Sequence, residues 1–262
     1  MRMLFYMLVL SISCFLAIMA CGEQTATTSE ISDEQQEPTS IDSLPAPQIQ
    51  ISGAEERLQI DYLRGQFEPS THPQFERVAD RYTDGDGSYY LHQAAYAAFK
   101  EMHAAAALDS VPLTIISATR NFERQRSIWE AKWRGERLLE GREKANEVYP
   151  DPADRARAIL RYSSMPGTSR HHWGSDLDLN RLTNEYFGQG LGKKVYDWLQ
   201  AHAASYGFCQ PYTAGRPHGY LEERWHWSYL PLAQPLTDFA REQATDEMIE
   251  GFEGAESSTQ IS

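Results

Sequence analysis

Cysteine is scarce in this sequence, with three residues among 262. That number excludes the disulfide-dense scaffolds on which many small secreted domains depend. Basic residues are absent from 22–50 and from 242–262, although each stretch carries six acidic residues. Removing these twelve acidic residues and Arg2 from the totals of 37 and 24 leaves 25 acidic and 23 basic residues in 51–241, a net charge of −2. The middle of the chain therefore lacks the basic footprint of a nucleic-acid-binding protein.

The N-terminal region has the pattern of an export signal. Residues 1–20 carry one positive charge and the apolar run 4–20, which is too short, and too soon followed by polar sequence, for a membrane anchor. Residues 18–21 resemble the lipobox of bacterial lipoproteins. We expect a signal peptide over 1–20, lipidation of Cys21, and an exported, membrane-anchored lipoprotein that faces the periplasm or the cell exterior. The alternative is ordinary cleavage near Ala20, which would leave Cys21 as a thiol.

Two acidic stretches flank a region long enough to fold. Residues 22–50 are rich in Ser, Thr, Gln, Glu and Pro and cannot bury a core, so we interpret 21–50 as a lipidated cysteine followed by a disordered linker. The composition of 242–262 predicts a disordered acidic tail. The intervening 51–241 has no internal repeat or low-complexity segment, and its length suits one domain, which we expect to be monomeric.

The hydrophobic pattern of 51–241 alternates between helical and strand periods. Apolar residues spaced by three and four predict helices over 90–108, 122–142, 154–161 and 192–206. Short β-branched or alternating runs predict strands over 111–118, 175–180, 208–212 and 224–230. Residues 61–83 have no lasting period, which indicates an extended arm with short helical pieces. The order of these elements, without regular βαβ units, predicts an α+β fold in which helices flank a small antiparallel sheet.

Four metal-binding or acid–base side chains lie in two short segments. His171 and Asp178 are seven residues apart, and a second histidine, His226, follows Glu223 by three residues. Two histidines and one carboxylate form the three-ligand set of a catalytic zinc that keeps a position for water, and a further glutamate can serve as the base. Glu222 is a second candidate base, but the three-residue offset to His226 selects Glu223.

These segments also resemble a known family. The pattern Ser-Arg-His-x-x-Gly-Ser-x-x-Asp over 169–178, followed by Glu-x-Trp-His over 223–226, is similar to that of the zinc D-alanyl-D-alanine carboxypeptidases and dipeptidases of bacterial cell-wall metabolism, including the vancomycin-resistance enzymes. An upstream Ser-x-x-Arg-(x)4-Gln extends the resemblance to about 90–229. It implies that zinc is bound by His171, Asp178 and His226, that Glu223 is the base, and that Arg120 contacts substrate or developing charge. The further candidates for substrate binding are Ser117, Gln125, Ser169, Asp176 and Trp225.

Asp176 departs from the family pattern because many members have alanine at this place. Its carboxylate has three possible roles: tuning a metal ligand, binding a substrate ammonium, or facing solvent. The resemblance implies a single zinc-peptidase domain that hydrolyses the terminal D-Ala-D-Ala bond of peptidoglycan stem peptides. The alternatives are a D,D-dipeptidase, an L,D-carboxypeptidase or an endopeptidase of the same family. A non-catalytic, zinc-stabilised cell-wall-binding module is the alternative from another class.

Overall fold

The structure is a computed structural model that describes residues 53–85, 87–217 and 219–261. The predicted signal peptide, the lipidation at Cys21 and the linker to residue 50 lie outside this range. Among the described residues, no helix combines the length and the apolar character needed to cross a membrane.

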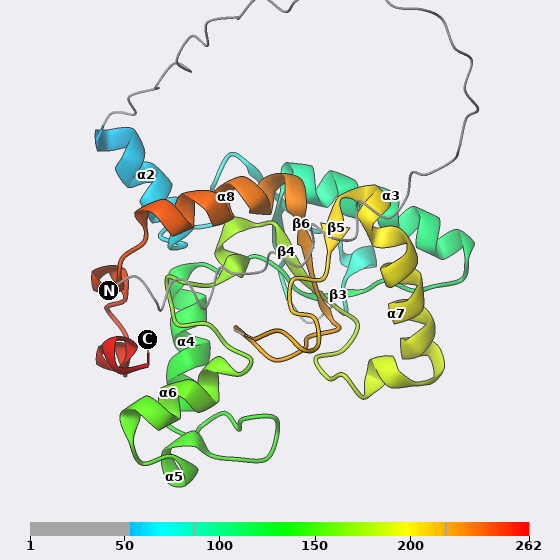
Figure 1. The fold of residues 1–262 in the computed structure, drawn as a ribbon. Helices are drawn as coiled ribbons and strands as arrows, with labels where there is room; N and C mark the ends of the chain where they lie inside the picture. The colour runs from blue at the N-terminus through cyan, green and yellow to red at the C-terminus, as the bar shows by residue number, and fades with distance from the viewer. Residues whose placement is uncertain (1–52, 86, 218, 262) are drawn as a thin grey trace, which may run out of the picture.

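A four-stranded antiparallel sheet forms the centre of the fold (Figure 1). Its strand order is β3-β4-β6-β5, with bounds Ile115–Ser117, Asp176–Leu179, His226–Tyr229 and Phe208–Cys209. A separate antiparallel pair consists of β1, Phe75–Arg77, and β2, Tyr90–His92. The α+β class with small antiparallel sheets is therefore confirmed, and each of the four predicted strands contains one strand of the central sheet.

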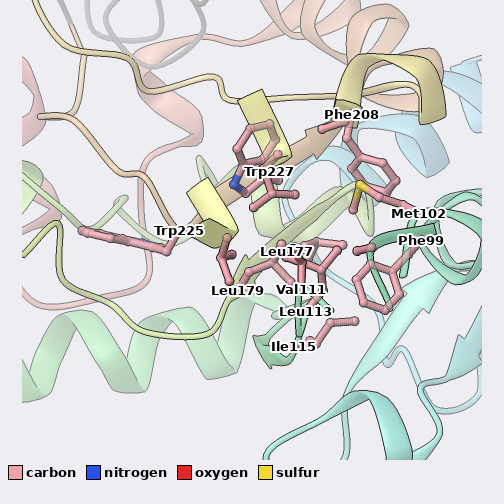
Figure 2. Packing of buried hydrophobic residues seen from close by; sticks show 14 of the residues in the cluster. Phe99, Met102, Val111, Leu113, Ile115, Leu177, Leu179, Phe208, Trp225 and Trp227 are labelled. Atoms are coloured by element: carbon pink, nitrogen blue, oxygen red, sulfur yellow. The ribbon is translucent and has the colours of Figure 1, made fainter. Parts of the chain in front are cut away.

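One face of the sheet is apolar and the other polar because strand side chains alternate. Leu177 and Leu179 on β4 are fully buried in the main core together with Trp227 on β6 (Figure 2). This core packs under α3, Gln93–Leu108, and α7, Gly190–His202. The intervening side chains of the same two strands project from the opposite face, where the candidate site lies.

A second helical group stands beside the sheet, as Figure 1 shows. It comprises α4, Phe122–Trp133, α5, Ala145–Val148, and α6, Pro152–Leu160. Helix α4 begins where its predicted cap lies, since the Asn121 side chain accepts a hydrogen bond from the Arg124 N–H. It ends nine residues earlier than predicted, because Gly135 follows with φ 74°, a left-handed conformation that continues no helix.

The C-terminal segment contradicts the prediction of a disordered tail. Helix α8, Leu230–Gln243, is followed by two 3₁₀ helices, Asp246–Met248 and Ala255–Gln260. The side chains of Ile249, Phe252 and Ile261 are buried in the same core as α4 and α6. Three spaced apolar anchors hold the segment on the domain although its average composition is polar and acidic.

Helix α2 and four further short 3₁₀ helices complete the described elements. Helix α2, Gly53–Leu63, covers the start of the predicted extended arm. The remaining 3₁₀ helices span Asp80–Tyr82, Arg170–Trp173, Tyr186–Gly188 and Ala203–Tyr206, in addition to those of the C-terminal segment. The one at Arg170–Trp173 precedes β4 and carries the first predicted metal ligand.

Candidate active site

Sheet pairing brings the three predicted metal ligands together. Asp178 on β4 lies directly opposite His226 on β6, and His171 lies on the 3₁₀ helix that precedes β4. The ligand atoms of the three residues all lie within 4.8 Å of one another. His171 Nε2 is 3.5 Å from Asp178 Oδ2, and His226 Nδ1 is 3.1 Å from Asp178 Oδ1. The three side chains are buried, so their donor atoms meet away from bulk water.

The outer nitrogen of each imidazole is held by an acceptor. His171 Nδ1 is 2.8 Å from the Ala118 carbonyl oxygen, which can only accept, so Nδ1 carries the proton and Nε2 presents its lone pair. His226 Nε2 likewise donates to Asp176 Oδ2 at 2.7 Å, which leaves Nδ1 as the inward atom. These are the outer partners that metal-binding histidines usually have.

The inward atoms are suited to a cation. In the part of the chain that the structure describes, buried His171 Nε2 and Asp178 Oδ1 have no hydrogen-bond partner of acceptable geometry. Burial disfavours the charged carboxylate of Asp178, but the neighbouring His171 and His226 hold its pKa below the usual range. Two nitrogens and a carboxylate match the donor set of zinc and leave one position open, so the residues fit that metal.

Asp176 lies behind His226 and does not line the cavity. Its carboxylate is fully buried and accepts hydrogen bonds from four groups: Arg170 Nε at 2.9 Å, His226 Nε2 at 2.7 Å, Ser175 Oγ at 2.5 Å and Ser228 Oγ at 2.7 Å. The predicted substrate contact is therefore wrong for this residue. The alternative role, as an outer partner of a metal ligand, matches the geometry.

Arg170 neutralises Asp176 inside the protein. Its guanidinium also donates to Ser228 Oγ at 2.6 Å and to Thr237 Oγ1 of α8 at 3.1 Å, and the side chain is 4% exposed. The ion pair thus connects the motif that carries His171 to β6 and α8. Because Arg170 compensates the negative charge of Asp176, this carboxylate can orient His226 without leaving a net buried charge beside the imidazole.

Glu223 faces the same cavity as the ligands. Its Oε2 atom lies 3.5 Å from His226 Nδ1, and burial raises the pKa of its carboxyl to about 8. A carboxylate with raised basicity beside the candidate metal ligands is suited to accept a proton. Glu222 instead pairs with Arg224, whose Nε is 3.0 Å from Glu222 Oε1, so the structure separates the two candidate bases as the spacing predicts.

Arg120 is positioned by the backbone of the metal-binding motif. Its N–H donates to the His171 carbonyl oxygen at 3.0 Å, and its carbonyl oxygen accepts from His172 Nδ1 at 2.6 Å. Arg120 lines the cavity, and its buried Nε has no hydrogen-bond partner among the described residues. The site therefore offers a guanidinium donor beside the three ligands.

The other predicted substrate contacts divide into two groups. Ser117, Ser169 and Trp225 line the cavity, and Ser169 Oγ also accepts from the His171 N–H at 3.3 Å. Gln125 does not line it: the side chain lies on the buried face of α4, fully enclosed, and Nε2 donates to the Ser164 carbonyl oxygen at 2.8 Å. Its predicted direct role in substrate binding is therefore wrong, and it supports the cavity wall instead.

The cavity has a volume of about 1100 Å³ and includes residues that the motifs did not indicate. Lys132 and Ser163 lie on its wall, and Lys132 Nζ donates to Ser163 Oγ at 2.5 Å. Tyr212 and Tyr220 also line it. Of these four residues, only Lys132 could have been identified from the sequence. It follows Gln125 by seven residues, so the two side chains share one face of the predicted helix.

Comparison with known proteins agrees with this geometry. A family model described as VanY, D-alanyl-D-alanine carboxypeptidase, matches residues 88–232, more than half of the chain. The putative carboxypeptidase YodJ of Bacillus subtilis (strain 168) is 28% identical over 148 residues, which are 54% of this chain. That alignment covers 46% of YodJ, so the chain spans about half the length of this curated relative.

Two solved structures are also similar. One is a mutant of the vancomycin-resistance D,D-pentapeptidase VanY from a VanB-type resistance cassette in complex with Zn(II), with 21% identity and a TM-score of 0.46 over 70% of this chain and 93% of that one. The other is the LdcB LD-carboxypeptidase, with 18% identity and a TM-score of 0.48 over 76% of this chain and 81% of that one.

Proposed function

Because this chain belongs to the VanY family of D-alanyl-D-alanine carboxypeptidases, we propose that it hydrolyses the terminal D-Ala-D-Ala bond of peptidoglycan stem peptides with a zinc ion bound by His171, Asp178 and His226. One observation carries the proposal. The inward atoms of these three side chains converge in a cavity that Glu223 and Arg120 also line. The family model confirms the predicted family, whereas the metal and the roles of individual residues belong to the proposal.

Zinc bound there would supply Lewis acidity, which polarises a carbonyl oxygen and lowers the pKa of water to about 7. Glu223 accepts the proton of the attacking water, whose oxygen forms the new bond to the carbonyl carbon. The C–N bond then breaks, and Glu223 returns the proton to the leaving amine. Arg120 donates hydrogen bonds to the oxygen on which negative charge develops. Ser117 and Ser169 offer hydroxyl groups to the peptide backbone.

The size of the cavity supports a peptide longer than a dipeptide. Its volume of about 1100 Å³ is slightly above the range of about 300–1,000 Å³ found for small-ligand pockets. A carboxypeptidase must accommodate the stem peptide on the amino side of the cleaved bond, whereas a dipeptidase binds two residues only. The volume therefore leaves room for the longer substrate that a carboxypeptidase binds.

Product masses test the reaction directly. The zinc-loaded protein is incubated with a stem pentapeptide and, separately, with free D-Ala-D-Ala. We expect loss of one alanine from the pentapeptide and slower cleavage of the dipeptide. Cleavage of the dipeptide alone indicates a D,D-dipeptidase. If neither peptide is cleaved but the protein binds cell-wall sacculi tightly, it is a binding module and the proposed activity is wrong.

A matched pair of variants tests the base. Glu223→Gln should keep its zinc and lose hydrolysis by about 10²- to 10⁴-fold, because the amide cannot accept the proton. Glu222→Gln is the control, since this neighbouring carboxylate is bound by Arg224 and lies outside the cavity lining. Near-normal turnover by the Glu223→Gln protein would remove this residue from the mechanism.

A further inference from the structure

Lys132 is a cationic side chain for which the hydrolytic mechanism has no role. It lies in the last turn of α4, partly buried, on the wall of the cavity that contains the candidate metal ligands. Its ammonium donates to Ser163 Oγ at 2.5 Å. Within the described ranges no carboxylate oxygen lies within 4.0 Å of Lys132 Nζ, so none of its three donors has a charged partner and one is used by the neutral Ser163 hydroxyl.

The other four lysines of the sequence have different surroundings. Lys144 and Lys193 pair with Glu147 and Asp197 at 2.8 and 2.5 Å. Lys194 donates to two backbone carbonyl oxygens, and the ammonium of Lys100 lies 4.5 Å from the centroid of a tyrosine ring. Lys132 is thus the lysine that is held inside a cavity by a single neutral hydroxyl.

The wall around Lys132 carries further positive charge. Arg120, Arg124, Arg137 and Arg142 line the same cavity. Burial, followed by the charges of Arg137 and Arg120, lowers the pKa of Lys132 to about 8, and the opposite influences of Glu223 and Glu140 are smaller. Arg124, Arg137 and Arg142 are exposed to water, and four acidic residues, Glu140, Asp178, Glu185 and Glu223, line the cavity as well. Arg120 Nε, however, is buried without a hydrogen-bond partner, and Lys132 is partly buried with donors to spare, which is costly unless an anion binds there. The cavity is therefore suited to a ligand that carries carboxylate groups.

We propose that Lys132, oriented by Ser163, binds a carboxylate of the substrate in this cavity. The inference rests on the proposed function and makes it more specific: the substrate is an anionic peptide, and recognition of its carboxylate is separated from the chemistry at Arg120. A stem peptide offers two such groups, the carboxylate at its C-terminus and a side-chain carboxylate of an earlier residue. Both have the same chemistry, and the experiment distinguishes them.

The test compares Lys132→Met with the wild type on three peptides. The first has both carboxylates, the second has a C-terminal amide, and the third has its side-chain carboxylate amidated. For the first peptide we expect Lys132→Met to raise KM by about 10- to 100-fold with little change in kcat, which is the size of a hydrogen bond to a charged group. Amidating the carboxylate that Lys132 contacts should raise the wild-type KM by a similar factor. The KM of Lys132→Met should be the same for the amidated peptide as for the peptide with both carboxylates.

Two further variants control for charge and for packing. Lys144→Met removes the same charge from a lysine of the same helical group that lies outside the cavity, and it should leave KM unchanged. Lys132→Arg keeps a cation and should restore part of the affinity. A Lys132→Met protein with equal KM increases for all three peptides, or with none, overturns the proposal.

A binding measurement keeps the inference separate from catalysis. The dissociation constants of the same peptides are measured by calorimetry for zinc-loaded Glu223→Gln and for Glu223→Gln/Lys132→Met, with melting temperatures recorded for both. If the wild type cleaves none of the peptides, the proposed function fails. The carboxylate-dependent loss of binding still decides the role of Lys132, because it requires no turnover. Equal binding by the two proteins contradicts the proposal.

Discussion

The most informative perturbation of the site is removal of the Asp176 carboxylate, although this residue does not line the cavity. Asp176 Oδ2 accepts both from His226 Nε2 at 2.7 Å and from Arg170 Nε at 2.9 Å. Asp176→Ala should therefore have two separable effects. His226 loses the acceptor that keeps Nδ1 pointing at the proposed metal, and Arg170 becomes a buried cation without its carboxylate partner.

The two effects have different expected sizes. Removing one partner of a buried ion pair costs about 3–5 kcal/mol of stability, because the other charge stays buried without compensation. Arg170 keeps its hydrogen bonds to Ser228 and Thr237, so we expect the lower end of that range. Loss of an outer partner of a metal ligand typically lowers metal affinity by about 10- to 100-fold.

A double variant separates the effects. Arg170→Met/Asp176→Ala removes both charges, so it should recover much of the stability of the metal-free protein in urea denaturation. It should not recover zinc affinity measured by chelator competition, because His226 Nε2 still lacks its acceptor. The reasoning is refuted if Asp176→Ala binds zinc as tightly as the wild type, or if the double variant regains zinc affinity in parallel with stability.

Three further predictions concern the metal, the cavity and the C-terminal segment. His226→Ala should contain less zinc by elemental analysis after dialysis, and full occupancy would refute its role as a ligand. Because Lys132 is charged below its pKa of about 8 and neutral above it, the wild-type KM should rise as pH increases through 8, and it should rise more steeply than KM of Lys132→Arg, since ionisation of Glu223 with a pKa of about 8 affects both proteins alike. Phe252→Ala should lower the free energy of unfolding by about 3 kcal/mol in urea denaturation, because the buried ring packs with its centroid 5.8 Å from that of Trp129. Leu108→Ala is the control: this side chain is 89% exposed, and its removal should change the free energy of unfolding by no more than about 0.5 kcal/mol.

The clustering of the three candidate ligands was predictable because the strands that carry two of them are strongly patterned. Strict alternation over 175–180 and 224–230 indicates strands, and two antiparallel strands with polar residues on one face bring Asp178 opposite His226. The spacing of Glu223 and His226 also separates the carboxylate that lines the cavity from Glu222. These features depend on neighbours within a few residues, which a sequence displays directly.

The function of Asp176 depends instead on partners that are distant in the chain. Its four donors come from two positions near β4 and two positions on β6, and Arg170 reaches α8 through Thr237. A carboxylate of unknown partners has several possible roles, and the sequence left three open. The C-terminal segment was misjudged for a related reason: composition averages over 242–262, whereas Ile249, Phe252 and Ile261 contribute individually to a core built from α4 and α6.

Helix α4 shows how one helical face supports two roles. Gln125 and Lys132 are seven residues apart, so they point in the same direction about 10 Å apart along the axis. At the Gln125 end, α4 is buried against the segment before the metal-binding motif, and the amide donates to the Ser164 carbonyl oxygen. At the Lys132 end, the same face borders the cavity, and the ammonium donates to the adjacent Ser163. The family motif indicates the glutamine, which supports the wall, and helix periodicity then identifies the lysine one heptad later as the side chain placed to meet a ligand.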